Sequence, residues 1–497
     1  MQWANFLHIY QPAEQQADIL EAIAAQSYRP IINHLTNNKH ARLTFNINGA
    51  LTELLDKYGY RDLLDQLRAL GERGQIEFTG APKYHAFLPF LEENEIIRQI
   101  EENNKTNKYF LGQGYAPKGF FPTEMAYKES LAPLIKSLGF EWIILDEIAS
   151  GDKPGTLDYS YLYKIENSDL FVFLRERRLS NLIMSAVVRS KETLKEAMKS
   201  DLKSQRYVVT AMDGETFGHH RPGLEKMLFD ILNTKDFKLV TLSDLIQSGR
   251  PVKNINPIQS TWASSEEDIK KGIQFLSWSD PENSIHSWQW MLTALALHEV
   301  RHLNKNHPRF KMVRQKMDLA LASDHFWWAS AKPWWSVEMI EDGAYRLLEV
   351  IRLIPEVKAA ILDRARDLYE RIISTAFHWQ RTGKIRTMMQ EQRGITRIPF
   401  KERTIGKGGA ERGVYHAFLD MMQRLETEAK NRGEYEKAIL WRDAQFKLEN
   451  KLDIYDTVNA IDLLRVEIPH TEVESVIEKY KEKYRAIRGG QPEQRGN

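Results

Sequence analysis

Acidic residues follow two short apolar stretches at points where a β-strand would end. Residues 207–212 are apolar and are followed at once by Asp213 and Glu215, on either side of a glycine. Earlier in the chain, Glu124 follows the apolar residues 119–121 and a proline. Such an acid can simply cap the next helix. Two of them on different strands favour paired-carboxylate chemistry, of which the commonest form is glycoside hydrolysis with retention.

The elements that would position these acids alternate along the first half of the chain. Strands are predicted at residues 3–9, 42–47, 75–79, 119–121, 142–145, 170–174, 207–212 and 238–241. Helical spacing occupies residues 51–73 and 93–111 between them. This alternation is typical of a parallel sheet, and seven or eight such units favour a barrel over an open sheet. An open doubly wound sheet is the alternative, but no glycine-rich phosphate motif follows the first strand.

The active site of a parallel barrel lies at the carboxyl ends of its strands. We expect four polar residues to lie there, each at or just past the end of a different strand, namely His8, Glu77, Glu124 and Asp213. The sequence therefore predicts one site assembled from several strands.

After residue 250, helical spacing replaces the alternation of strand and helix signals. A chain of 497 residues is also longer than a single hydrophobic core usually accommodates. Residues 251–257 are predicted to be a linker, and helices are predicted at 287–304, 311–323, 340–354, 356–373, 415–431 and 435–464. We expect a catalytic barrel at 1–250, a helical region completing the active site at 251–355, and a C-terminal helical region at 356–497. Residues 381–413 are predicted to form a basic loop and the last residues a disordered tail.

Composition excludes several classes of function. There are 69 basic and 68 acidic residues, so the formal charge of +1 gives no reason to expect nucleic acid or an anionic membrane as partner. No cysteine is present, which excludes disulfides, thiolate metal sites and a cysteine nucleophile. The first residues lack the basic region of a signal peptide, and no stretch approaches the roughly 18 apolar residues of a membrane span. We expect a cytoplasmic protein, whose oligomeric state the sequence does not indicate.

One segment mimics a metalloprotease motif. His298 and His302 satisfy the H-E-x-x-H pattern inside a predicted helix, where they would share a face. No clear third ligand follows, although Glu338 or Glu341 could be considered. We therefore interpret both histidines as helix-surface or interface residues.

Five segments in order resemble a known family. They are His8-Ile-Tyr-Gln-Pro12, residues 74–77 with 80–85, residues 119–127 around Glu124, residues 213–218, and a weaker set made of Thr261, Trp262, Trp278, Asp280, Asn283, Gln289 and Trp290. Each is weak alone, but their order over residues 1–300 resembles glycoside hydrolase family 57. The run 323–328 (Ser-Asp-His-Phe-Trp-Trp) is also similar to sequences of this family.

The resemblance implies an α/β fold, an incomplete (β/α)7 barrel followed by a mostly α-helical region. It also implies retaining enzymes that act on α-glucans or malto-oligosaccharides, with Glu124 as nucleophile, Asp213 as general acid/base, and no cofactor or metal. Expected substrate-binding residues are His8, Tyr10, Gln11, Glu77, His85, Glu215, Trp262, Trp278, Asp280 and Trp288. Many members carry a second histidine where this chain has Tyr10. Glu215 remains an alternative for the acid.

Some choices stay open. The family includes α-amylases, 4-α-glucanotransferases, amylopullulanases and branching enzymes, and the sequence does not choose among them. A different class of function would be a metal-dependent, polysaccharide deacetylase-like hydrolase with His8, Asp213, His219 and His220 around a metal, or a non-catalytic carbohydrate-binding relative. Sensitivity to a chelator separates the metal hydrolase from a carboxylate-pair enzyme.

Overall fold

The computed structural model describes residues 1–388, except 186, 187, 189, 200, 205 and 333, and residues 412–450. It divides into two compact units, which are described separately. The first comprises Met1–His219 and Met227–Met389, and the second comprises His220–Lys226 and Gln390–Asn497. All residues discussed below as a site belong to the first unit.

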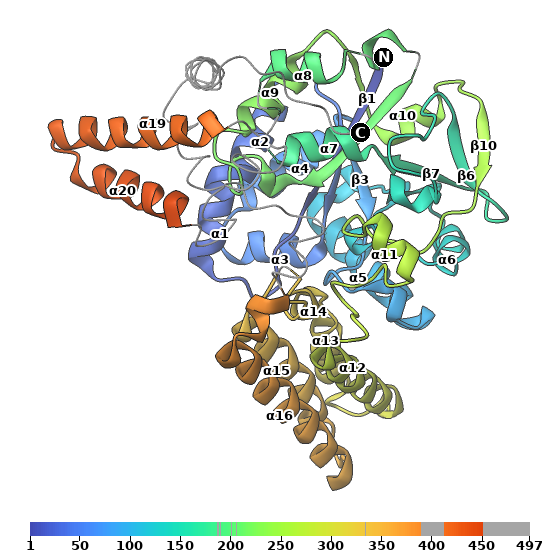
Figure 1. The fold of residues 1–497 in the computed structure, drawn as a ribbon. Helices are drawn as coiled ribbons and strands as arrows, with labels where there is room; N and C mark the ends of the chain where they lie inside the picture. The colour runs from blue at the N-terminus through green and yellow to red at the C-terminus, as the bar shows by residue number, and fades with distance from the viewer. Residues whose placement is uncertain are drawn as a thin grey trace. The chain divides into compact units, whose positions relative to one another are not determined.

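Seven parallel strands form the barrel of the first unit (Figure 1). Their order in the sheet is β7-β5-β4-β3-β2-β1-β8. They are β1 (Gln2–Ile9), β2 (Leu43–Ile47), β3 (Ile76–Gly80), β4 (Gly119–Phe120), β5 (Trp142–Asp146), β7 (Leu170–Arg175) and β8 (Tyr207–Asp213). Each matches a predicted strand, because fully buried strands read as continuous apolar runs.

Three further strands extend the sheet. β9 (Lys238–Val240) pairs with the first half of β1, whereas β2 pairs with its second half, so that both share one edge of β1. β6 (Leu162–Ile165) is antiparallel to β7, and β10 (Val252–Ile255) is parallel to β6. The prediction that residues 251–257 form a linker was wrong. Three of the four residues of β10 are exposed, so this edge strand lacks an apolar signal.

The barrel is incomplete between β7 and β8. At this point the backbone N–H of Glu176 donates to the carbonyl of Val209 at 2.8 Å. Two side chains also cross the gap, because Arg175 Nε donates to the carbonyl of Ala211 at 2.7 Å and the N–H of Ala211 donates to Ser180 Oγ at 3.3 Å. We refer to this junction, formed by residues 175–180 and 209–211, as the seam. The resulting fold is the incomplete (β/α)7 barrel expected from the sequence.

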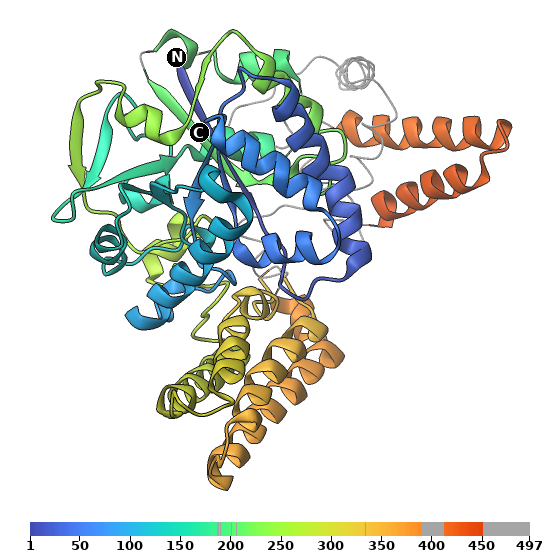
Figure 2. The ribbon, with the colours of Figure 1, turned by 180° about the vertical axis from the view of Figure 1, so that it is seen from behind.

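Helices cover the outside of the barrel. They include α1 (Ala17–Ile23), α2 (Arg29–Asn37), α3 (Gly49–Lys57), α4 (Arg61–Glu72), α5 (Glu93–Leu111), α6 (Leu131–Ser137), α7 (Arg177–Met184), α8 (Lys191–Ala197), α9 (Glu225–Asn233) and α10 (Leu242–Ile246). The blue helices in front in Figure 2 come from the N-terminal end of this series. The helical pattern at 51–73 is two helices, because Gly59 adopts a φ of 86° that ends α3.

A helical bundle follows the barrel in the same unit. Its long helices are α12 (Ser284–His302), α13 (Phe310–Ala320), α15 (Val337–Leu353) and α16 (Ala359–Thr382), joined by the short α11 (Glu266–Lys271) and α14 (Asp324–Trp327). One hydrophobic core runs from barrel residues such as Leu145 to Leu292 on α12 and Ile372 on α16. The predicted helices of this region are confirmed, and α16 continues nine residues beyond the predicted end at 373.

The second unit contains two described helices that pack on each other, α19 (Arg412–Asn431) and α20 (Tyr435–Asn450). Phe418, Met422 and Trp441 are buried in this unit. Most of the predicted basic loop, the end of the helix predicted to reach residue 464 and the predicted tail lie outside the described residues. In the part of the chain that the structure describes, no helix is long and apolar enough to cross a membrane.

A buried charge cluster joins the barrel to the bundle. Arg314 on α13 contacts Glu95 on α5 at 2.6 Å and Asp318 at 2.7 Å. Arg98 on α5 also donates to both carboxylate oxygens of Asp318. Because the cluster is largely removed from water, each charge depends on its partners.

We predict that Arg314→Leu lowers the free energy of unfolding by about 3 kcal/mol, because Glu95 and Asp318 lose a buried partner. The matched control is Arg371→Leu on α16, whose pair with Asp367 is 55% exposed on both sides and should change stability by less than about 0.5 kcal/mol. Urea denaturation of both variants measures the difference. Equal effects would show that the cluster does not stabilise the junction.

Candidate active site

Glu124 lies in a strained turn at the carboxyl end of β4. Its backbone has φ 60° and ψ 20°, and Met125 follows with φ 50°. Left-handed backbone at a residue other than glycine costs about 1–3 kcal/mol and persists only when the surroundings impose it. The surroundings here include hydrogen bonds from Met125 N to Pro122 O at 2.8 Å and from Trp262 N to Glu124 O at 3.1 Å.

Trp262 also binds the carboxylate of Glu124. Its indole Nε1 donates to Glu124 Oε2 at 2.6 Å. The segment that carries Trp262 is attached to the turn after β4 by an antiparallel bridge between Tyr127 and Ser260. A chain segment from beyond the barrel therefore fixes both the backbone and the side chain of Glu124.

Asp213 is the last residue of β8 and lies opposite His8 in the register of β1 and β8. Burial raises the pKa of Asp213 to about 6, although the nearby Arg175 guanidinium opposes that shift. Burial and the charge of Asp213 together raise the pKa of Glu124 to about 8, against the opposing hydrogen bond from Trp262. The two predicted catalytic carboxyls are thus both partly buried, and the charge of Asp213 acts on Glu124.

His8 is held as a neutral imidazole. Its Nδ1 lies 2.7 Å from Asn46 Oδ1, and the Asn46 amide donates onward to Thr79 Oγ1 at 2.8 Å. Because Asn46 uses its N–H₂ on Thr79, its oxygen must accept from His8, so Nδ1 carries the proton and Nε2 is an acceptor. Burial lowers the pKa of His8 to about 4, which keeps the ring neutral.

Three rings stack beside Glu124. Tyr10 and His85 lie 4.1 Å apart between ring centroids, and His8 lies 5.2 Å from His85, with near-parallel planes. His85 Nδ1 is 3.2 Å from Ser323 Oγ, and its Nε2 lies 3.8 Å from Glu124 Oε1. That Nε2 is buried without a hydrogen-bond partner in this part of the chain, so a polar group is left directed at the carboxylate. Burial lowers the pKa of His85 well below its usual value.

Asp324 is a site residue that the sequence reasoning did not select. Tyr10 Oη donates to Asp324 Oδ2 at 2.8 Å, and Asp324 contributes to the raised pKa of Glu124. Burial raises the pKa of Asp324 itself to about 6. The only signal for Asp324 in the sequence was the run 323–328. Its contact with Tyr10 could not be predicted, because the two residues are more than three hundred positions apart in the chain.

The motif residues on α12 hold the segment that carries Asp324. Asn283 Nδ2 donates to the carbonyl of Ala329 at 2.8 Å, and Gln289 Nε2 donates to that of His325 at 2.9 Å. The ring of Trp290 stacks on Phe326 with centroids 4.0 Å apart. These members of the fifth sequence segment therefore support the site without belonging to it.

Glu215 and Gln11 are joined by a hydrogen bond, and Glu215 lies close to Asp213 in the chain. Glu215 Oε1 accepts hydrogen bonds from Tyr28 Oη, from Tyr10 N at 3.2 Å and from Gln11 Nε2 at 3.4 Å. Burial and the charge of Asp213 raise the pKa of Glu215 to about 8. Glu215 lies in the turn Gly214–Thr216 and not in β8, so it does not share the direction of Asp213 as a strand residue would.

Glu77 does not lie at the carboxyl end of β3 as expected, because it is the second residue of that strand. Its Oε2 accepts from Thr44 Oγ1 and from Ser243 N, each at 3.1 Å, which ties β2 and α10 to β3. A surface depression at the same amino end of the barrel, lined by residues such as Arg42, Lys238 and Asp244, is likewise distant from Glu124 along the strands.

Three other predicted sugar-binding residues have protein partners in the helical region. Trp278 is 1% exposed and stacks on Phe87 with centroids 4.9 Å apart, so its ring is covered. Trp288 is partly buried against the main core. Asp280 accepts from Lys332 Nζ at 2.7 Å. The structure shows no contact of these three with the catalytic pair in the part of the chain it describes.

The histidine motifs do not gather a ligand set. His298 and His302 are exposed on α12, as expected, with His302 Nδ1 2.7 Å from the carbonyl of His298. For the alternative metal site, His8 is bonded to Asn46 and His219 Nδ1 lies 2.7 Å from Gln26 Oε1. Within the described ranges, no group of three histidine, aspartate or glutamate side chains is arranged to hold a metal ion.

Comparison with known proteins gives consistent matches. The sequence model of glycosyl hydrolase family 57 matches residues 3–257, just over half of the chain. Alpha-amylase 1 of Dictyoglomus thermophilum is 28% identical over 216 residues, which are 43% of this chain and 31% of that protein. The 4-alpha-glucanotransferase of Thermococcus litoralis is 26% identical over 310 residues, which are 58% of this chain and 46% of that protein. The chain spans less than half the length of either relative.

A solved structure supports the fold. The branching enzyme of the same family from Pyrococcus horikoshii superposes with a TM-score of 0.57 at 16% identity, covering 76% of this chain and 96% of that one. The matched segment 3–257 contains all seven barrel strands, Glu124 and Asp213. On the strength of that match, and in agreement with the barrel and its partly buried carboxyl pair, the chain belongs to glycosyl hydrolase family 57.

Proposed function

We propose that this protein is a retaining enzyme acting on α-glucans or malto-oligosaccharides, with Glu124 as nucleophile and Asp213 as general acid/base. The observation that carries the proposal is that these two carboxyls lie partly buried at or past the carboxyl ends of β4 and β8, where the charge of Asp213 raises the pKa of Glu124. The names of the family relatives, an α-amylase and a 4-α-glucanotransferase, support the substrate class. The cytoplasmic location remains a prediction from the sequence.

The carboxyl pair holds the number of protons that the reaction needs. With pKa values of about 8 for Glu124 and about 6 for Asp213, the pair carries one proton near pH 7. The pair shares that proton, and the reaction requires its transfer to Asp213 before it starts. A glycosidic oxygen accepting from Asp213, together with the hydrogen bond from Trp262 to Glu124, favours the transfer.

Two displacements then follow. In the first, Glu124 attacks the anomeric carbon, the glycosidic C–O bond breaks, and the proton of Asp213 goes to the departing oxygen. In the second, the hydroxyl of water or of another sugar attacks the same carbon, the ester to Glu124 breaks, and the proton of that hydroxyl goes to Asp213. Both residues return to their starting state, and no metal is required for either step.

The residues around the pair suit a neutral, hydroxyl-rich substrate. His8 presents an unprotonated Nε2, which can accept a hydrogen bond from a sugar hydroxyl. His85 presents an Nε2 without a protein partner beside Glu124. Because both imidazoles are kept neutral by burial, they contribute hydrogen bonds without drawing the carboxylate into an ion pair.

We predict that Glu124→Ala reduces turnover of maltoheptaose by several orders of magnitude, because the covalent step is lost. Added azide or formate should partly restore turnover by occupying the vacated place. The matched control is Glu129→Ala, an exposed acid of the same loop, which should turn over normally. Unchanged turnover in Glu124→Ala would remove Glu124 from the mechanism.

We expect a bell-shaped pH profile of kcat/KM with limbs near pH 6 and pH 8. Below the lower limb both carboxyls are protonated and no nucleophile remains, and above the upper limb both are ionised and no acid remains. Glu215 needs a control variant, because its own pKa is also about 8 and its titration could produce the upper limb. Both limbs should persist in Glu215→Gln, and loss of the upper limb in that variant would assign it to Glu215.

The stereochemical outcome tests the proposed function directly. Proton NMR during the first minutes of reaction with maltoheptaose should show the α-anomer appearing first, because two displacements restore the configuration. Initial appearance of the β-anomer would overturn the retaining mechanism. Separation of the same products by length and linkage distinguishes hydrolysis, transfer and branching. Shorter sugars alone mean hydrolysis, longer and shorter oligomers mean transfer, and new α-1,6 linkages mean branching.

A further inference from the structure

Apart from one backbone hydrogen bond from Glu176 to Val209, one edge of β8 is held by side chains and not by a paired strand. At the seam, Arg175 Nε donates to the carbonyl of Ala211 and Ser180 Oγ accepts from its N–H. Side chains from the end of β7 and from α7 thus bind both the carbonyl and the N–H of Ala211, which lies two positions before Asp213. The position of Asp213 depends on these contacts, because in the described part of the chain β8 pairs in the sheet only with β1.

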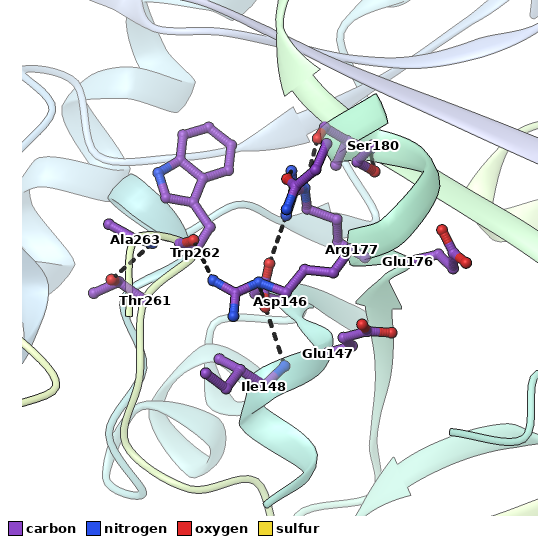
Figure 3. A network of polar contacts seen from close by, with 12 residues as sticks. Asp146, Glu147, Ile148, Glu176, Arg177, Ser180, Thr261, Trp262 and Ala263 are labelled. Carbon is purple, nitrogen blue, oxygen red and sulfur yellow. Dashed lines mark hydrogen bonds and ion pairs between the residues drawn. The ribbon is translucent and has the colours of Figure 1, made fainter. Parts of the chain in front are cut away.

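A neighbouring arginine holds the segment that orients Glu124. Arg177 Nη2 donates to the carbonyl of Trp262 at 2.8 Å and to that of Ser264 at 2.6 Å. Figure 3 shows the guanidinium of Arg177 between the backbone at Trp262 and the side chain of Asp146. Since Trp262 Nε1 binds the carboxylate of Glu124, Arg177 is one contact removed from that carboxylate.

One carboxylate joins the two arginines. Asp146, the last residue of β5, is fully buried. Its Oδ2 lies 2.7 Å from Arg175 Nη1, and its Oδ1 lies 3.0 Å from Arg177 Nε and also accepts from Ile148 N at 3.0 Å. Buried charges are retained only when geometry and hydrogen bonding compensate their desolvation. Through Arg175 and Arg177, this cluster connects the two sides of the site.

We propose that Asp146, Arg175 and Arg177 are positioning residues that hold the catalytic pair in register, Arg175 acting on Asp213 through β8 and Arg177 acting on Glu124 through Trp262. The inference rests on the proposed function for the roles of Glu124 and Asp213. A separate observation agrees with it, since the charge of Arg175 lowers the pKa of Asp213 against the effect of burial.

A double-mutant cycle tests the inference. Arg177→Lys keeps a cation beside Asp146 but cannot also donate to both carbonyls, and displacement of Trp262 should lower kcat on maltoheptaose about 100-fold with KM within about threefold. Trp262→Phe removes the hydrogen bond to Glu124 by itself. In that background Arg177→Lys should lower kcat by less than about threefold, because the contact through which it acts is already absent.

The control lies on α16, away from the seam. Arg371 pairs with Asp367 and both side chains are 55% exposed, so Arg371→Lys should leave kcat unchanged. Equal losses of kcat from Arg177→Lys in both backgrounds would overturn the inference, whereas wild-type protein inactive on α-glucans would instead overturn the proposed function. If the lysine variant does not fold, Arg177→Gln, whose shorter side chain lacks the guanidinium, enters the same cycle and the same two outcomes decide.

Discussion

The burial of two neighbouring carboxyl groups is the constraint on which the rest of this structure depends. Glu124 and Asp213 are both partly buried, and the described contacts give neither of them an arginine or lysine in direct ion pairing. Burial raises both pKa values, so the pair retains a proton at neutral pH. A cation in contact with Glu124 or Asp213 would lower the pKa of that group and change which of the two holds the proton. Arg175 instead donates to the backbone near Asp213 and forms its ion pair with Asp146.

The loops that carry the site do not support themselves. Glu124 and His85 both have left-handed backbone, and each carbonyl accepts from a segment beyond residue 250, from Trp262 N at 3.1 Å and from Ser323 N at 3.1 Å. Antiparallel bridges at Tyr127–Ser260 and Ala86–Ala322 attach the same two segments. The helical region thus compensates the local strain that places the functional groups, as is usual where strain is stored at a site.

The fold and the site indicate the class of bond that is cleaved, but they do not indicate which of the related reactions follows. A partly buried carboxyl pair with neutral imidazoles fits cleavage of a glycosidic bond, but hydrolysis, transfer and branching share these steps and differ in what accepts the glycosyl group. Relatives in one family therefore carry different names, and function has to be argued from the site itself.

The sequence by itself determined the barrel strands, most helices and the positions of Glu124 and Asp213, because apolar runs and the residues that end them are local signals. It misplaced Glu77, since composition does not show at which end of β3 a polar residue falls, and it missed β10, whose exposed edge carries no apolar pattern. Only the tertiary structure decided that Trp262, Asp324, Arg175 and Arg177 surround the pair. Their contacts join segments far apart in the chain, and such proximity arises from packing, which leaves no periodicity in the sequence.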